Sequence, residues 1–247
     1  MPRQARKQSE SGIYHIMLRG NNQQQIFEDE EDNKKYIEVL NDCKLISGYK
    51  IFAYCLMGNH LHLLIKVEKE TLEQIFKRIG ARYVYWYNWK YRRKGHLFQD
   101  RFKSEPIDDD QYFLAALRYI HQNPVKAGLG GLEYKYSSYN EYINSNDEQL
   151  TDINFVFEMI GKEQFISFHN KNNEDKFLDV ETNDLRLTDS QAREIIEKVS
   201  KCKTVVEFQG LDIEQRNKYI KQLKENGISI RQISRLTGIS KGRVEKI

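Results

Sequence analysis

Two histidines separated by a single residue carry the clearest chemical signal in this sequence. His60 and His62 lie in the run GNHLHLLI, which continues as an apolar stretch typical of a strand interior. Side chains alternate between the two faces of a strand, so both imidazoles are expected to point to the same side. Two imidazoles on one face can share a metal ion, but a His-x-His pair alone is a weak signal.

A second signal lies downstream in ALRYIHQNPVKAGL, where Tyr119 and Asn123 are four residues apart. On the helix expected there, this spacing puts both side chains on one side, one turn apart. Because Asn123 precedes Pro124, the pair is expected near a helix end. Cleavage of a nucleic-acid strand by a protein nucleophile needs a hydroxyl in line with phosphorus and a cation beside the phosphate oxygens. Tyr119 can supply the hydroxyl, and the histidines can hold the cation.

The amide oxygen of Asn123 could add a third, neutral ligand to the histidine pair. Neutral ligands leave the charge of the ion undiminished for a phosphate. Two imidazoles and an amide suit Mn²⁺ or Zn²⁺ better than Mg²⁺, although a phosphate and waters that complete an octahedron would also make Mg²⁺ serviceable.

The composition sets broad limits on the chain. Its 247 residues are 39% hydrophobic and 30% charged, and the net charge of +3 is too small to prove a polyanionic partner. No apolar run approaches the ~20 residues of a membrane span, and no secretory signal opens the chain, so no membrane partner is expected. Cys43, Cys55 and Cys202 lack metal or disulfide spacing. A cytoplasmic, nucleoid-associated location is the expectation.

The order of expected elements predicts an α+β fold. Strands at 13–18, 49–56, 60–67 and 97–107 alternate with helices at 32–46 and from Thr71 onward, and a further helix covers 112–122. This is the split βαβ pattern of a ferredoxin-like sandwich with a four-stranded antiparallel sheet. Helices on one face would leave the other face for the histidines. The catalytic domain is expected at 10–143.

The remainder of the chain is expected to be helical. Residues 144–185 are interpreted as a helical or linker segment, with 170–175 as the linker candidate. Within 186–247, helices at 216–225, 230–236 and 241–247 indicate a helix-turn-helix-like DNA-binding region. The alternative is a small helical bundle that packs on the first domain.

Several basic and polar residues are candidate DNA contacts. An aromatic and basic run at 82–94 could stack bases and hold phosphates, although it could equally be a partly buried helix face. His96 and His121 are expected at the surface or on DNA rather than as metal ligands. The candidate contacts are Arg19, Asn21, Arg82, Arg92, Arg93, Arg101, Lys103, Lys241, Arg243 and Lys246.

Taken in order, GNHLHLL, LFQDRFKSEPI and ALRYIHQNPVKAGL resemble the single-tyrosine HUH transposases of the insertion-sequence 200-like superfamily. The opening GIYHIMLRGNNQQQIF resembles the branch of REP-associated tyrosine transposases. The resemblance covers about residues 10–143. It implies a transposase that cleaves single-stranded or hairpin DNA with Mg²⁺ or Mn²⁺, through a 5′-phosphotyrosine. By the same resemblance Tyr119 is the nucleophile, and His60, His62 and Asn123 are the metal ligands.

Two other functions stay open at this point. A non-catalytic regulator derived from a transposase would use only the helix-turn-helix region, and the intact set of histidines, tyrosine and asparagine favours the enzyme over it. A rolling-circle replication or relaxase nuclease shares the His-x-His chemistry, but often shows a tyrosine pair or a third histidine. The oligomeric state, monomer or homodimer, also stays open.

Overall fold

The computed structural model of the chain describes residues 6–144, 149–171, 177, 187 and 189–247. The chain divides into two compact units, Met1–Glu181 and Thr182–Ile247, which are described separately below. Among the described residues, no helix is long and apolar enough to cross a membrane.

A four-stranded antiparallel sheet forms the centre of the first unit. Its strands are β1 (Ile13–Arg19), β2 (Lys50–Met57), β3 (His60–Lys66) and β4 (Lys103–Ile107), in the spatial order β2-β3-β1-β4. The two central strands are therefore β1 and β3, and a helix follows β1 and another follows β3. This arrangement confirms the predicted α+β, ferredoxin-like fold.

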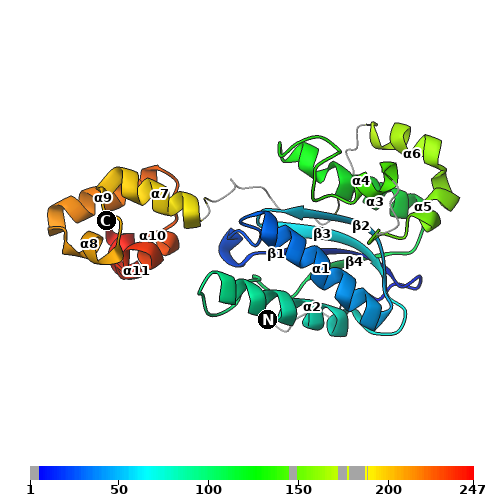
Figure 1. Ribbon diagram of the computed structural model, residues 1–247, viewed down its shortest axis with the longest axis horizontal. Coiled ribbons are helices and arrows are strands. Elements are labelled where there is room, and N and C mark those ends of the chain that lie inside the picture. The colour runs from blue at the N-terminus through cyan, green and yellow to red at the C-terminus, as the bar shows by residue number, and fades with distance from the viewer. Residues whose placement is uncertain (1–5, 145–148, 172–176, 178–186, 188) are drawn as a thin grey trace. The chain divides into compact units, whose positions relative to one another are not determined.

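Helices α1 (Glu30–Ser47) and α2 (Leu72–Lys90) cover one face of the sheet (Figure 1). Both begin with a capping box, in which Asp29 and Thr71 accept a hydrogen bond from the third helical residue. Gly48 ends α1 in the left-handed conformation at φ 69°, which costs glycine little. The apolar side chains of these helices pack on the even-numbered residues of β1, such as Ile16, so this layer is a conventional hydrophobic core.

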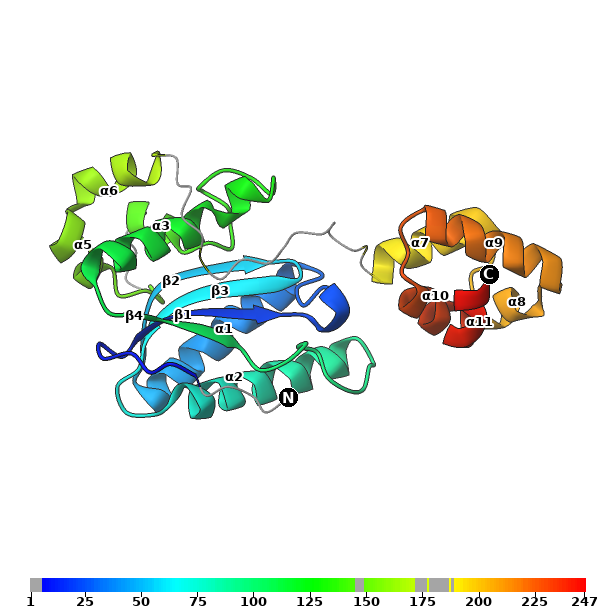
Figure 2. The ribbon, with the colours of Figure 1, turned by 180° about the vertical axis from the view of Figure 1, so that it is seen from behind.

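The histidine face of the sheet is also covered, contrary to the expectation that helices would occupy one face only. Helix α3 (Asp110–Lys126) lies against this second face (Figure 2). This face is covered because it also carries apolar side chains. Phe52 and Leu64 are fully buried against α3 residues. The short helices α4 (Tyr139–Ile143), α5 (Ile153–Ile160) and α6 (Lys162–His169) complete this layer.

Strand β4 is shorter than the predicted strand at 97–107. Phe98 bridges Gly20 at the end of β1, but the pairing then stops until Lys103. In the gap, the amide of Arg101 donates to the Asp100 carboxylate at 2.8 Å instead of to a neighbouring strand. This local side-chain acceptor competes with the sheet ladder and interrupts the strand.

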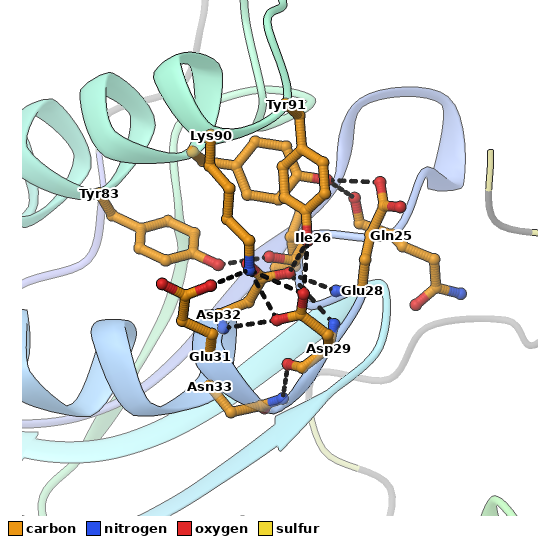
Figure 3. A network of polar contacts seen from close by, with 11 residues as sticks. Gln25, Ile26, Glu28, Asp29, Glu31, Asp32, Asn33, Tyr83, Lys90 and Tyr91 are labelled. Atoms are coloured by element: carbon orange, nitrogen blue, oxygen red, sulfur yellow. Dashed lines mark hydrogen bonds and ion pairs between the residues drawn. The ribbon is translucent and has the colours of Figure 1, made fainter. Parts of the chain in front are cut away.

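A polar network ties the end of α2 to the start of α1 (Figure 3). The ammonium group of Lys90 lies 2.7 Å from Asp29 and 2.9 Å from each of Glu31 and Asp32. These carboxylates raise the pKa of Lys90, although its partial burial alone would lower it. Nearby, the hydroxyl of Tyr83 donates to the carbonyl of Ile26 at 2.5 Å. The network therefore fixes the segment that follows β1.

That segment in turn holds the turn before the first histidine. The amides of Ile26 and Phe27 donate to the carbonyl of Gly58 at 2.8 and 3.0 Å, and the amide of Gly20 donates to the carbonyl of Asn59 at 2.8 Å. Because Asn59 precedes His60 directly, the two helices on one face help to position a side chain on the other.

Helices are the regular elements among the described residues of the second unit. It contains α7 (Asp189–Ser200), α8 (Val205–Gly210), α9 (Ile213–Glu225), α10 (Ile230–Thr237) and α11 (Lys241–Lys246). The helices share their own apolar core, separate from those of the first unit. The predicted linker at 170–175 lies largely outside the described residues.

Candidate active site

His60 and His62 lie side by side on β3, on the face that α3 covers. Their ring centroids are 5.2 Å apart and the ring planes are nearly perpendicular, at 86°. His60 is 5% exposed and His62 is fully buried. The predicted strand is therefore present, and both imidazoles project from the same face of the sheet.

The hydrogen bonds of the pair restrict which nitrogen of each ring can carry a proton. The carbonyl oxygen of the Asn59 side chain can only accept, so the Nδ1–H of His60 donates to it at 2.7 Å. The Nε2 atom of His60 then holds the lone pair. The Nε2 atom of His62 is buried and has no hydrogen-bond partner among the described residues. Burial, with neighbouring His15 and His60, lowers the pKa of His62 well below its ordinary value, so the ring is neutral.

Tyr119 lies on the inner side of α3 and faces the second histidine. Its ring centroid is 5.8 Å from that of His62, in an edge-to-face arrangement. The ammonium group of Lys126 lies 4.6 Å from the centre of the tyrosine ring, and the ring of Phe177 lies 4.8 Å away. Tyr119 is only 1% exposed. Tyr119, the candidate nucleophile, thus lies beside His62, with Lys126 and Phe177 in contact with its ring.

Asn123 lies one turn beyond Tyr119, as the spacing predicts. Its amide nitrogen donates to the carbonyl of Tyr119 at 2.9 Å, which leaves the amide oxygen as the available ligand atom. Pro124 does not end the helix: α3 continues to Lys126. Asn123 is therefore in the last turn of α3, close to the helix end that its position before a proline predicts.

The side chains of the histidine pair and of Asn123 offer neutral donor atoms, two imidazoles and an amide. Among the described residues, no group of three or more His, Cys, Asp or Glu side chains is arranged to hold a metal. A site built on His60 and His62 would therefore need an amide, such as that of Asn123, or oxygen atoms from water and phosphate. Such a mixed set suits Mn²⁺ well and can serve Mg²⁺ when oxygen ligands predominate.

Residues 8–123 match a family model described as "Transposase IS200 like". The chain resembles the IS200-like transposase family over these residues, which include His60, His62, Tyr119 and Asn123. A solved structure of a REP-associated tyrosine transposase bound to a REP hairpin has a TM-score of 0.51 and 15% identity, over 62% of this chain and 94% of the other. This likeness concerns the fold, and the family model supports the resemblance that the motifs predict.

A second solved structure is of a putative transposase from Deinococcus radiodurans R1. It has 14% identity over 45% of this chain and 90% of the other, and its TM-score of 0.35 is too low for an argument about the fold. Among curated protein sequences, none is significantly similar to this chain.

Two of the candidate DNA contacts share the histidine face of the sheet. Arg19 pairs directly with His60 across β1 and β3, and Lys103 pairs with Met17 across β1 and β4. Residues opposite each other on antiparallel strands project from the same face. Both cations are thus on the side where a phosphate near the histidines would lie. Of the other candidates in this region, Asn21 begins the short 3-10 helix η1 (Asn21–Gln23), and Arg101 is exposed before β4.

The aromatic and basic run at 82–94 belongs to α2 and its C-terminal turn, on the opposite face of the sheet. Arg82 lies 3.5 Å from Asp42, and the guanidinium of Arg93 lies 5.3 Å from the ring centre of Tyr87. Arg92 is exposed. Of the aromatic residues, some are buried in the core and others are exposed: Tyr83 and Tyr87 are buried, whereas Tyr85 and Trp89 are 78% and 72% exposed. The structure does not bring these arginines to the histidine pair.

In the second unit, Lys241, Arg243 and Lys246 are all exposed on α11. At about 100° per residue, Arg243 and Lys246 are roughly 60° apart around the helix, whereas Lys241 is more than 120° from both. Lys241 lies 3.1 Å from Glu245. The three side chains therefore do not project together, and only Arg243 and Lys246 form a common basic edge.

His121 is not at the surface, so the expectation of a surface or DNA contact is wrong for this residue. It is fully buried, with Nδ1 2.9 Å from Nε2 of His169 and Nε2 2.8 Å from the hydroxyl of Ser138. The Nδ1 atom of His169 is 2.8 Å from the carbonyl of Phe165. His121 therefore joins α3 to α6 in the structural core. His96 is exposed, as expected.

The buried pair of His121 and His169 is expected to make the first unit unstable in acid. Burial lowers the pKa of His169 to about 4 and that of His121 well below its ordinary value. Because the folded state holds both rings neutral, their contribution is complete above the unfolded-state pKa of about 6.5 and is lost as the pH falls toward 4. We expect His169 alone to account for about 3 kcal/mol of the free energy of unfolding over this range.

The measurement is chemical denaturation at a series of pH values between 7 and 4. A His169→Phe variant serves as the control, because it cannot titrate: it starts less stable at pH 7 but should lose less stability on acidification. An equal slope for both proteins would contradict the prediction.

Sequence reasoning missed two residues that contact Tyr119 and two behind the histidines. Lys126 and Phe177 contact the tyrosine ring, His15 lies beside His62, and Glu105 lies beside His15. A histidine inside the apolar strand segment IYHIML was the available signal for His15. Its alternation places it on the face opposite to that of Tyr14 and Ile16.

Proposed function

We propose that this chain is an IS200-like transposase, which cleaves and rejoins single-stranded or hairpin DNA through a 5′-phosphotyrosine intermediate, with Mg²⁺ or Mn²⁺ as cofactor. The observation that carries the proposal is the juxtaposition of Tyr119 with His62, whose Nε2 atom is buried and has no hydrogen-bond partner among the described residues. A buried ring nitrogen without a hydrogen-bond partner is unfavourable in a residue that only packs, and a bound cation would account for it. A cytoplasmic, nucleoid-associated location and a monomer or homodimer belong to the same proposal.

The chemistry assigns one task to each residue. The hydroxyl oxygen of Tyr119 attacks the phosphorus atom in line with the 3′ oxygen, and gives up its proton. The bond between phosphorus and the 3′ oxygen breaks, and that oxygen takes a proton to leave as a free 3′-OH. A divalent ion held by His60, His62 and the Asn123 amide would offset the charge on the non-bridging phosphate oxygens. Rejoining is the reverse attack by a 3′-OH on the phosphotyrosine.

Arg19 and Lys103 are proposed to hold the phosphates that flank the scissile bond. Both project from the histidine face, and Arg19 is the direct cross-strand neighbour of His60. Cations at such positions add affinity that is independent of sequence and decreases with salt.

The direct test uses a hairpin oligonucleotide with a single-stranded flank, since the related solved structure holds a REP hairpin. The label is placed on the fragment 3′ of the break, because its new 5′ phosphate is the group that becomes linked to Tyr119. Incubation with Mg²⁺ or Mn²⁺ should transfer this label to the protein, as a band that survives denaturing electrophoresis. A protein that binds the oligonucleotide but never becomes linked to it would instead support the non-catalytic regulator.

The second unit is proposed to be a separate DNA-binding module, with α10 and α11 as a helix-turn-helix. Ending the chain at residue 181 should leave the first unit folded, because the two units are compact by themselves. Binding to duplex or hairpin stems should weaken, and its dependence on salt should flatten by close to one unit of slope for each phosphate that the protein no longer binds. Cleavage of a short single-stranded oligonucleotide should persist.

The matched control keeps the chain whole and replaces Arg243 and Lys246 with glutamine. This variant should reproduce the flatter salt dependence, while Lys241→Gln should change it least, because Lys241 projects away from the other two. If the shortened protein precipitates or no longer cleaves the oligonucleotide, the second unit is part of the structure of the first.

A further inference from the structure

A third histidine lies behind the pair on β3. His15, in the middle of β1, is fully buried, and its Nε2 atom is 2.9 Å from Nδ1 of His62. The two rings are stacked, with centroids 5.1 Å apart and planes 29° from parallel. Because Met17 is the direct cross-strand partner of His62, His15 approaches it diagonally on the same face of the sheet.

A carboxylate lies on the far side of His15. Glu105 is its direct cross-strand partner on β4, and its Oε2 atom is 3.8 Å from Nδ1 of His15. This distance is too long for a hydrogen bond, so the carboxylate acts on the ring through its charge. Glu105, His15 and His62 thus form a row across three adjacent strands, which ends at the buried Nε2 atom of His62.

The contact between His15 and His62 allows two proton arrangements along this row, and the charge of Glu105 distinguishes them. A neutral histidine has one N–H and one lone pair, so a lone pair on Nε2 of His62 requires the proton on Nδ1. That N–H then donates to Nε2 of His15, and the proton of His15 must be on its Nδ1 atom. The negative charge of Glu105 stabilises a proton at that position. The charge of Glu105 therefore favours the tautomer of His62 with its lone pair on Nε2.

We propose that His15 and Glu105 are positioning residues, which fix the ring of His62 and keep its Nε2 lone pair directed away from β1 for a divalent cation. This inference rests on the proposed metal site, and it adds a second layer of residues to it. Partners of this kind orient a metal-binding imidazole, and their loss typically lowers metal affinity roughly 10- to 100-fold.

The alternative is that His15 only fills space in the core. The two roles differ in what a replacement must provide: packing needs volume, whereas orientation needs a hydrogen-bond acceptor facing His62. His15→Gln retains an acceptor and His15→Leu does not. Glu105→Gln removes the charge at a side chain that is 30% exposed, and so tests the row without disturbing the core. Met17→Leu changes packing beside His62 and is the matched control.

The experiment measures two quantities in the absence of DNA. The tautomer of His62 is determined by nitrogen NMR of the metal-free protein at fixed neutral pH, and the affinity for Mn²⁺ alone is determined by calorimetry. We expect the wild type to carry the proton on Nδ1. His15→Leu should shift the proton toward Nε2 and weaken Mn²⁺ binding roughly 10- to 100-fold. Glu105→Gln should act in the same direction by a smaller factor, while His15→Gln and Met17→Leu should stay close to the wild type.

The outcomes separate this inference from the proposed function. If the wild type binds Mn²⁺ and both His15→Leu and Glu105→Gln bind it equally well with an unchanged tautomer, His15 and Glu105 are packing residues and the inference is wrong. If the wild type binds no Mn²⁺, the metal site itself fails and the inference fails with it. Should His15→Leu not fold, the tautomer and affinity of Glu105→Gln and His15→Gln decide the matter.

Discussion

A Tyr119→Phe variant is expected to fold and to bind hairpin DNA, but to form no covalent protein–DNA adduct. Phenylalanine retains the ring that packs beside His62 and Phe177, and loses only the hydroxyl that would attack phosphorus. The loss of one buried hydroxyl should change the free energy of unfolding by about 1 kcal/mol. Denaturing electrophoresis with a labelled product strand measures the adduct, and thermal unfolding checks the fold.

Tyr112→Phe is the matched control for this variant. Tyr112 lies on the same helix, and its ring stacks 5.2 Å from that of Phe177. It should cleave DNA at the rate of the wild type. Adduct formation by Tyr119→Phe would show that another residue is the nucleophile, whereas loss of hairpin binding by that variant would give Tyr119 a role in the DNA-binding surface.

The sequence predicts the central layer of the first unit well, because local patterns determine it. The alternation in GNHLHLLI and the caps of α1 and α2 depend on neighbours a few residues away. The four residues selected for chemistry also come from local spacing within β3 and α3. Tertiary contacts were needed only to bring Tyr119 to His62, residues that are far apart in the chain.

Two features depend on distant partners and could not be predicted in this way. The cover over the histidine face follows from apolar residues such as Phe52, whose alternation on β2 is broken by an irregularity in register between Ile51 and Ala53. The burial of His121 depends on His169, which is 48 residues away on α6. A single histidine in an amphipathic helix has no local feature that separates a buried, paired ring from an exposed one.

His15 shows the same limit within a strand. The alternation of side chains along β1 places it on the histidine face. The positioning role proposed for it depends on Glu105, which is 90 residues further along the chain. The late start of β4 could not be predicted for a similar reason. The Asp100 side chain accepts a hydrogen bond from the Arg101 amide in place of a neighbouring strand, and the sequence pattern of the segment does not indicate this.

Removal of either histidine of the pair should abolish strand cleavage while hairpin binding changes by a modest factor. The charge stabilisation that a bound divalent ion gives to a phosphoryl oxygen is worth several kcal/mol. A loss of about 4 kcal/mol corresponds to a roughly thousand-fold lower rate of adduct formation. Binding should persist because phosphate contacts elsewhere, including those proposed for Arg19 and Lys103, dominate affinity for DNA.

His60→Ala and His62→Ala are the variants, and His96→Ala is the control, because His96 is exposed and lies outside β3. His62→Ala also removes the hydrogen bond to His15 in the core, so about 1 to 3 kcal/mol of stability should go with it, as thermal unfolding will show. His60→Ala leaves that hydrogen bond in place and removes instead the one to the Asn59 side chain, so thermal unfolding is measured for both variants. Excess chelator should reproduce the loss of cleavage in the unmodified protein, and added Mn²⁺ should restore it there but not in His60→Ala. Cleavage that persists in chelator would mean that Tyr119 attacks phosphorus without an ion, and the two imidazoles would then have to act as hydrogen-bonding or proton-transfer groups.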